Sequence, residues 1–236
     1  MLKARIKFRK FGVMKFIGHL DVMRYFQKAM RRAEIPIAFT SGYSPHMVMS
    51  FAQPLGIGIT SDAEYFDIEL TGNISPDDAV SQLNSVMVEG IEVVNFVRIA
   101  DDKKSSGMTI VAAAGYQVTL PETFHTSEVT KKLPESWAEQ AESFMDQEQI
   151  VVWKKTKRSE KEVDIKPMIY ELKVSEDSIY LLLATGSEQN LKPDLVMEAF
   201  GTYMGLDMAE IPVHYHRLEV YARKDSQLVP LDALEI

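Results

Sequence analysis

Apolar and basic side chains alternate strictly at the start of the chain. The apolar positions are Leu2, Ala4, Ile6 and Phe8, and the basic positions between them are Lys3, Arg5, Lys7 and Arg9. Because successive side chains of a strand point to opposite faces, this period of two predicts a half-buried strand with a basic solvent face.

The pattern changes to helical spacing from about Gly18 to Ala33. Apolar side chains recur there at intervals of three and four residues, at Leu20, Met23, Phe26 and Met30. The outer side of this predicted helix is basic, with Arg24, Lys28, Arg31 and Arg32. Pro36 ends the helix, and a loop rich in turn-forming residues follows at Ser41-Gly42-Tyr43-Ser44-Pro45-His46.

The first half continues with strands and one more helix. Met47–Phe51, Glu64–Thr71 and Ile91–Ile99 are predicted strands. Before the last strand, Ser75 is a predicted helix N-cap with Pro76 at the first helical position. The order strand, helix, strand, strand, helix, strand is that of the ferredoxin-like split βαβ motif.

The second half repeats this order more loosely after a polar linker at residues 101–107. Its predicted strands are residues 109–120, 149–154, 168–174, 179–184 and 212–223, with helical stretches up to residue 145 and over residues 192–204. We therefore predict an α+β fold of two tandem ferredoxin-like (βαββαβ) units, the second elaborated. The predicted domains are residues 1–100 and 107–225, and residues 226–236 form a tail.

Composition narrows the chemistry that the chain can perform. The sequence has no cysteine, which excludes disulfides, thiolate zinc sites, iron–sulfur clusters and thiol nucleophiles. The N-terminus lacks the apolar run of a signal peptide, and no segment is long and apolar enough to span a membrane. We expect a cytoplasmic protein with no membrane contact, and the sequence predicts no cofactor.

Charge is unevenly distributed along the chain. The net charge is −8, but residues 1–60 contain ten Lys or Arg residues against only Asp21 and Glu34, so this segment carries +8. Two explanations stay open: the basic segment contacts a phosphate-bearing partner, or it pairs with the acidic remainder of the same fold.

Candidate ligand-binding residues fall in three segments. In the segment Lys15–Asp21, backbone amides at the start of a helix attract anions. The loop at residues 41–46 combines hydroxyls, an aromatic ring and an imidazole, and residues 154–161 form a second basic run. The predicted ligand-binding residues are Lys15, His19, Arg24, Arg31, Arg32, Tyr43, Ser44, His46, Lys157, Arg158 and Lys161.

No catalytic residue and no metal site is assigned. His19 and His46 are candidates for an acid–base pair because imidazoles titrate near neutral pH. His214 and His216 alternate on one predicted strand, but the regular apolar spacing around them favours an ordinary strand over a metal site.

Several of these segments together resemble a known family. Lys15-Phe16-Ile17-Gly18-His19-Leu20-Asp21, Arg31-Arg32-Ala33, the 41–46 loop and the segments at residues 51–58 and 64–70 closely resemble the bacterial radical SAM-linked proteins, a domain of unknown function. The resemblance is specific over residues 3–72 and extends through Lys157, Arg158, Lys161, Asp164 and Ile165. It implies a bacterial protein encoded beside, or fused to, a radical S-adenosylmethionine (SAM) protein.

These observations lead to three functional hypotheses. The first is an accessory module that works with a radical SAM enzyme and presents RNA or another anionic substrate. The second is a metal-independent endoribonuclease-like enzyme with His19 and His46 as its acid–base pair. The third is a docking partner that contacts the radical SAM protein and no nucleic acid. The oligomeric state stays open.

Overall fold

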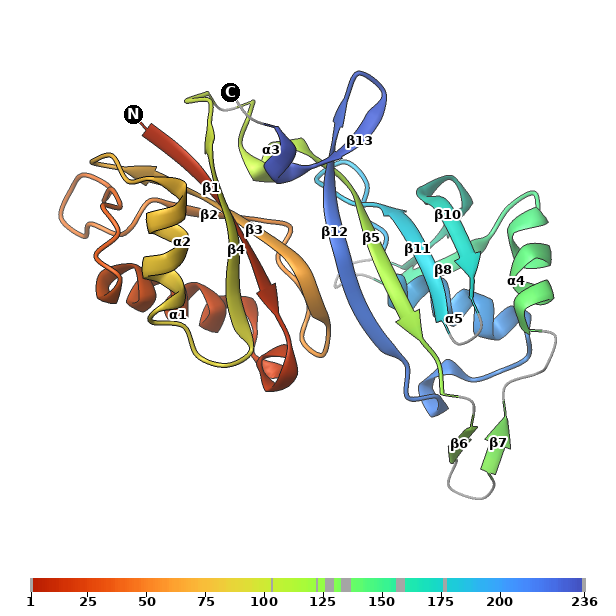
Figure 1. Cartoon of the computed structure of the whole chain (residues 1–236). Helices are drawn as coiled ribbons and strands as arrows, with labels where there is room; N and C mark the ends of the chain where they lie inside the picture. The colour runs from red at the N-terminus through yellow and green to blue at the C-terminus, as the bar shows by residue number, and fades with distance from the viewer. Residues whose placement is uncertain are drawn as a thin grey trace. The chain divides into compact units, whose positions relative to one another are not determined.

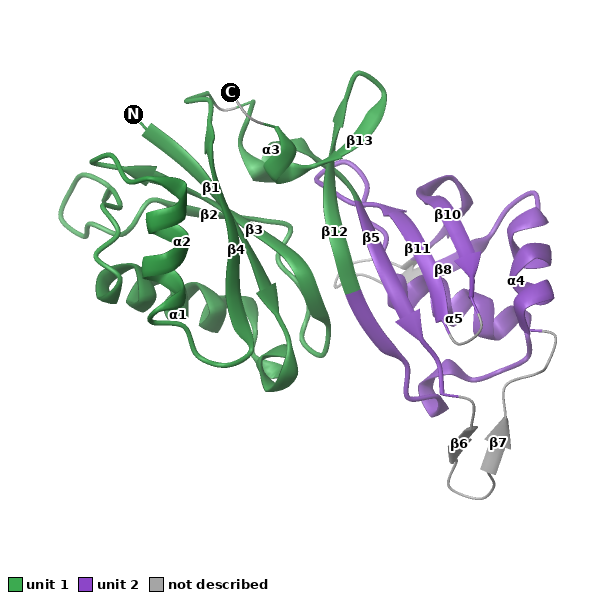
Figure 2. Cartoon of the chain, in the orientation of Figure 1, with its two compact units in different colours: residues 1–113, 217–236 green, residues 114–216 purple. Residues whose placement is uncertain are grey.

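The computed structural model describes residues 2–102, 104–121, 123–125, 130–132, 137–155, 160–175 and 178–234, with the backbone alone at residues 123–125, 130–132, 154, 155 and 160. The fold is mixed α+β, with a large mixed sheet and few helices. The chain divides into two compact units (Figure 2). Unit 1 comprises residues 1–113 and 217–236, and unit 2 comprises residues 114–216.

Unit 1 is built on an antiparallel arrangement of strands (Figure 1). Strand β1 (Leu2–Lys10) lies between β3 (Thr60–Leu70) and β4 (Ile91–Ile99) and is antiparallel to both. Strand β2 (Met49–Ala52) pairs antiparallel with β3. Strand β12 (His214–Lys224) also neighbours β3, and β13 (Gln227–Pro230) pairs with β12.

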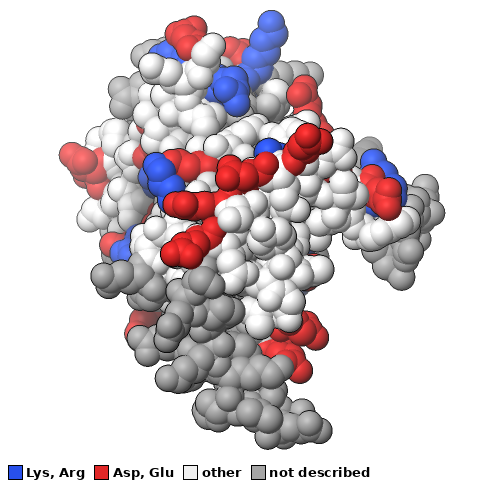
Figure 3. All heavy atoms as spheres, turned by 90° about the vertical axis from the view of Figure 1, so that its right-hand side faces the viewer, with Lys and Arg blue, Asp and Glu red and all other residues white. Residues whose placement is uncertain are grey.

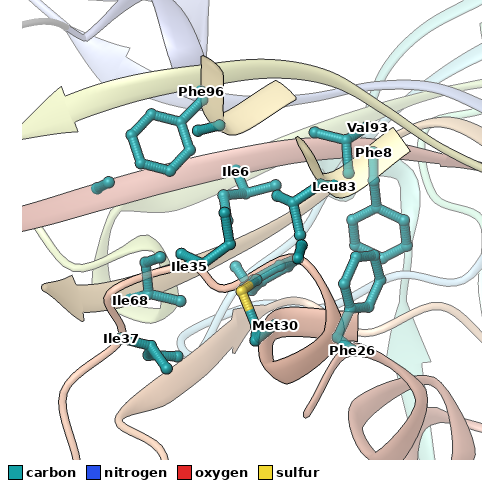
Figure 4. Close-up of a cluster of buried hydrophobic side chains, with 14 of the residues drawn as sticks. Ile6, Phe8, Phe26, Met30, Ile35, Ile37, Ile68, Leu83, Val93 and Phe96 are labelled. Atoms are coloured by element: carbon teal, nitrogen blue, oxygen red, sulfur yellow. The ribbon is translucent and has the colours of Figure 1, made fainter. Parts of the chain in front are cut away.

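Two helices cover one face of these strands. Helix α1 (His19–Arg32) follows a 3-10 turn, η1 (Gly12–Phe16), and α2 (Pro76–Asn84) lies between β3 and β4 in sequence. As predicted, Ser75 caps α2, and its side chain accepts a hydrogen bond from the amide of Asp78. The predicted apolar side of α1 is confirmed for Phe26 and Met30, which are fully buried against Ile6 and Phe8 of β1 (Figure 4). The rings of Phe8 and Phe26 lie 4.7 Å apart in an edge contact.

Unit 2 has its own strands and helices. Its strand order is β10 (Ile169–Val174), β11 (Ser178–Ala184) and β5 (Val111–Thr119), followed by β12, of which only residues 214–216 belong to this unit. Its helices are α4 (Trp137–Asp146) and α5 (Pro193–Tyr203). Two hairpins are added, β6 (Thr123–His125) with β7 (Thr130–Lys132) and β8 (Val151–Lys155) with β9 (Glu160–Asp164). Short turns complete the chain: α3 (Gly107–Ile110), η2 (Lys166–Met168), η3 (Met208–Glu210) and η4 (Leu231–Ala233).

The prediction that the basic side of β1 faces solvent is wrong at its centre. Arg5 is only 1% exposed, and its guanidinium binds both carboxylate oxygens of Asp67, at 2.7 and 3.0 Å. The same group donates to the carbonyls of Leu231 and Ser105. Segments far from β1 in sequence therefore cover this face, which local alternation cannot reveal.

The other cations on the Arg5 side of β1 are also paired. Lys7 donates to Glu219 at 2.6 Å, and Tyr65 donates to Glu219 and to Asp232. The remaining ion pairs of this face are Lys3 with Glu69 and Asp101, and Arg9 with Asp62 and Glu92. Much of the positive charge of the first strand is thus neutralised within unit 1.

No helix in the part of the chain that the structure describes is long and apolar enough to cross a membrane.

Candidate functional site

The start of α1 is formed by the segment that sequence analysis singled out. Gly18 is the N-cap and supplies no side-chain hydrogen bond to the first turn. A second loop packs against this segment: the amide of Gly58 donates to the carbonyl of Lys15 at 2.8 Å, and Ile57 lies close to Gly18. The ammonium of Lys15 lies 5.1 Å from the centre of the Phe16 ring. The loop at residues 57–58 therefore supports the segment that leads into α1.

A buried polar cluster lies on the helix-covered side of β1 and β3. Arg217 donates to the Glu64 carboxylate at 2.8 Å and to the carbonyl of Gln53 at 2.9 Å. Lys10 is 2% exposed, and burial lowers its pKa more than the attraction of Glu64 raises it, while Arg217 lowers it further. Gln53 has a positive φ of 50°, a conformation that is strained for a residue other than glycine. Arg217 thus pairs with the Glu64 carboxylate, whereas Lys10 is buried nearby without an ion pair among the described residues.

His19 lies beside this cluster. Its ring makes an edge contact with the ring of Phe51, with 5.0 Å between their centres. Burial lowers the pKa of His19, and the negative charge of Glu64 opposes this only in part. We expect His19 to be neutral at pH 7, so that it adds no positive charge to the start of α1.

The outer face of α1 is basic and exposed. Arg24 makes a loose pair with Asp21, at 3.4 Å, and Arg32 donates to the carbonyl of Val86. Among the described residues, Lys28 and Arg31 are exposed and have neither an ion pair nor a hydrogen bond from their side chains. Their charge faces water, in contrast to the paired charges of Arg5 and Lys7 on β1.

The 41–46 loop is exposed along its whole length. Tyr43 is fully exposed. Thr40 contacts His46 twice. Its hydroxyl lies 3.1 Å from Nδ1 of the His46 ring, and it accepts a hydrogen bond from the backbone amide of His46, also at 3.1 Å. Ser44 is exposed beside them. The loop therefore presents an aromatic ring, a hydroxyl and an imidazole to solvent.

The structure places the two candidate imidazoles, His19 and His46, apart from each other. Lys15 and His19 lie at the start of α1, whereas the 41–46 loop lies at the opposite end, where the chain leaves α1 and Ile37 pairs with Leu70 of β3. His46 and Phe51 are separated by extended chain, which spans roughly 17 Å for five residues. Because the His19 ring packs on Phe51, the two imidazoles do not share a site, and the endoribonuclease hypothesis gains no support.

Lys157 and Arg158 lie outside the described residues. Lys161 is exposed on β9 and opposes Lys154 across the β8–β9 hairpin of unit 2. No group of three or more His, Asp or Glu residues that could hold a metal ion occurs in the described part of the chain.

Comparison with known proteins identifies a family. Residues 3–193 match the family described as "Uncharacterized protein conserved in bacteria (DUF2344)". The chain belongs to this family. The match covers most of the sequence and includes α1, the 41–46 loop, Lys10 and Glu64. It confirms the prediction of a bacterial domain of unknown function. No curated protein matches the chain.

Sequence reasoning missed Lys10, Glu64 and Arg217 of the buried cluster. One signal was present for Lys10: it occupies the register of Ile6 and Phe8, so a charged residue stands where the alternation requires an apolar one. Arg217 lies outside the range that matches the family and is far from Glu64 in sequence, so no local pattern could pair them.

Proposed function

We propose that this member of the family is a binding module without catalysis of its own, which holds an anionic polymer, with RNA as the candidate, on the outer face of α1. The single observation that carries the proposal is the exposure of Lys28 and Arg31 without partners among the described residues. Cations that no carboxylate neutralises are the groups that gain most from contact with phosphates.

The geometry of α1 suits a charged polymer. Arg24, Lys28 and Arg31 follow one another at spacings of four and three residues, so they form one stripe along the helix. The 41–46 loop lies at the C-terminal end of this stripe, where the exposed ring of Tyr43 offers a surface for stacking an unpaired base. Positive charge positions the polymer, and Tyr43, Ser44 and His46 supply the specific contacts.

We further propose that the partner enzyme is a radical SAM protein. The sequence resemblance to radical SAM-linked proteins supports this, and the chain contains no cysteine to ligate the iron–sulfur cluster itself. The cluster and its chemistry would then belong to the partner, and this chain would present the substrate.

We also infer that each unit is ferredoxin-like. The strand order β4–β1–β3–β2 in unit 1 supports this inference, as does the order β12–β5–β11–β10 for unit 2 when the whole of β12, which begins in unit 2, is taken as its last strand. In both units the order along the chain is strand, helix, strand, strand, helix, strand, with hairpins added in unit 2.

A titration with labelled single-stranded RNA, followed by fluorescence anisotropy, tests the binding proposal. We expect Lys28→Glu with Arg31→Glu to weaken binding by at least about tenfold at low salt and to reduce the slope of log K against log salt. The matched control is Lys104→Glu with Lys224→Glu, which reverses two exposed charges away from α1. Equal losses in both double variants would show that α1 is not the binding face, and an absence of binding would reject the proposal.

A second candidate function is docking to a protein, and a specific surface favours it. Val13, Phe16, Leu20 and Ile57 are all more than half exposed around the start of α1. Exposed apolar clusters of this kind mark protein contacts. We expect Phe16→Ser with Ile57→Ser to abolish co-elution with the radical SAM protein encoded beside it while leaving RNA binding unchanged. Co-elution that survives in this variant would reject the docking surface.

A further inference from the structure

Unit 2 contains an apolar hollow that none of the functions above uses. Its volume is about 400 Å³, and it lies between the end of α4, strand β8 and helix α5. Buried Phe144 and Ile150 line it together with the more exposed Val151 and Leu195. This volume is in the range of sites that bind small molecules or single side chains.

Two aromatic side chains line the hollow and remain exposed. Trp153 of β8 is 67% exposed, and Tyr203 of α5 is 43% exposed. The ring of Tyr203 makes an edge contact with the ring of Phe144, with 5.6 Å between the ring centres. A large aromatic ring that faces water at the edge of a hollow is a site where a ligand can remove apolar surface from solvent.

The two helices beside the hollow are acidic, and Glu198 is the carboxylate among its described lining residues. Helices α4 and α5 contain Glu139, Glu142, Asp146, Asp194 and Glu198 and no lysine or arginine. Unit 2 has 18 acidic against 10 basic residues, so it carries the whole net charge of −8. Figure 3 shows acidic side chains outnumbering basic ones on the face of the molecule that it presents.

Glu198 has a central position on this surface. It lines the apolar hollow and also a second one of about 670 Å³, which includes Asp207 and Tyr215. Burial raises the pKa of the Tyr215 hydroxyl, and the charges of Asp194 and Glu198 raise it further. The two hollows share Glu198 and Thr202, and together they form what we call the α5 groove, to which the carboxylates of Glu198 and Asp207 give a negative charge.

We propose that the α5 groove binds a basic segment of a partner protein, with an arginine or lysine side chain in the hollow lined by Trp153 and Tyr203 and its charge at Glu198. Aromatic rings attract cations, and the aliphatic part of such a side chain covers apolar surface. A carboxylate at the groove complements the positive charge. The same negative charge repels phosphates, which argues against a nucleic acid in this place.

Fluorescence anisotropy of a labelled peptide tests the proposal on the full chain. The probe is a short peptide of alternating leucine and arginine, and its control replaces each arginine by citrulline, which keeps the shape of the side chain without its charge. We expect the arginine peptide to bind at least about tenfold more tightly than the citrulline peptide. We expect Glu198→Gln and Trp153→Ala each to weaken binding of the arginine peptide by about five- to tenfold.

The matched control is Glu188→Gln, an exposed acid of unit 2 that lines neither hollow. We expect this variant to bind like the unmodified chain. Equal binding of the two peptides would overturn the proposal, because the charge of the ligand would then be irrelevant. Equal losses in Glu198→Gln and Glu188→Gln would overturn the assignment to the groove. Direct binding of labelled single-stranded RNA that Glu198→Gln and Trp153→Ala weaken, and Glu188→Gln does not, would show that the groove takes nucleic acid instead.

Discussion

Lys10 offers the sharpest test of the buried cluster beside α1. It is 2% exposed, its ammonium has no hydrogen bond or ion pair among the described residues, and Glu64 is already bound by Arg217 at 2.8 Å. Removing an ammonium from water costs several kcal/mol, of which the nearby carboxylate recovers a part. We therefore expect Lys10→Met to raise the free energy of unfolding by about 1–2 kcal/mol at pH 7.

The pH dependence of this gain follows from the lowered pKa of Lys10. In the folded state Lys10 loses its proton at a lower pH than the ordinary lysine value of 10.5. Between the lowered pKa of the folded state and 10.5, the unfolded chain binds more protons than the folded chain. The stability of the unmodified protein therefore rises with pH in this range. The advantage of Lys10→Met should therefore be full at neutral pH and shrink as the pH approaches 10.5.

Urea unfolding of both proteins across this pH range measures the effect. Lys28→Met is the matched control, since Lys28 is exposed and should change stability by less than about 0.5 kcal/mol. A Lys10→Met variant that is less stable than the unmodified protein, or an advantage that does not change with pH, would refute the conclusion that burial of the ammonium costs stability.

Three further changes test other parts of the fold. Arg5→Met leaves the buried Asp67 carboxylate without its cation, and we expect a loss of about 3–5 kcal/mol in urea unfolding. Gly90→Ala places a Cβ atom 2.5 Å from Cγ of Met14 at a φ of +95°, so we expect a loss of at least about 2 kcal/mol by the same assay. His19→Gln removes a group of lowered pKa, so the unmodified protein should lose stability relative to this variant as the pH falls below 6.5, measured as Tm.

These predictions have their own controls. Gly58 also has a positive φ, of +89°, but has open space around it, so Gly58→Ala should cost clearly less than Gly90→Ala. Equal costs would mean that the close approach to Met14 is unimportant. A loss below about 1 kcal/mol in Arg5→Met would show that water reaches the Asp67 carboxylate. A Tm difference independent of pH would contradict the lowered pKa of His19.

Local patterns in the sequence predicted the elements of unit 1 well. The period of two predicted β1, and the spacing of Phe26 and Met30 predicted the buried side of α1, because burial of one face imposes these periods. Ser75 was predicted as a cap because its side chain can accept a backbone hydrogen bond two or three residues later. These signals depend only on residues that are close in sequence, so a single sequence is enough to show them.

Contacts between distant segments could not be predicted in this way. The basic side of β1 was expected in water because nothing near Arg5 in sequence indicates that Asp67 and the carbonyl of Leu231 cover it. The exposed stripe on α1 was visible from its spacing, but the absence of ion pairs at Lys28 and Arg31 among the described residues depends on where the acidic residues of unit 1 lie. The separation of His19 from His46 likewise follows from the path of the chain.

The most direct test of the account is to map the RNA contact on the chain itself. Backbone amide signals of the isotopically labelled, full-length protein would be followed by NMR during a titration with short single-stranded RNA at low salt. We expect the largest shifts on Arg24–Arg32 and on the 41–46 loop. Shifts confined to other segments, or none at all, would contradict the claim that α1 carries the binding face.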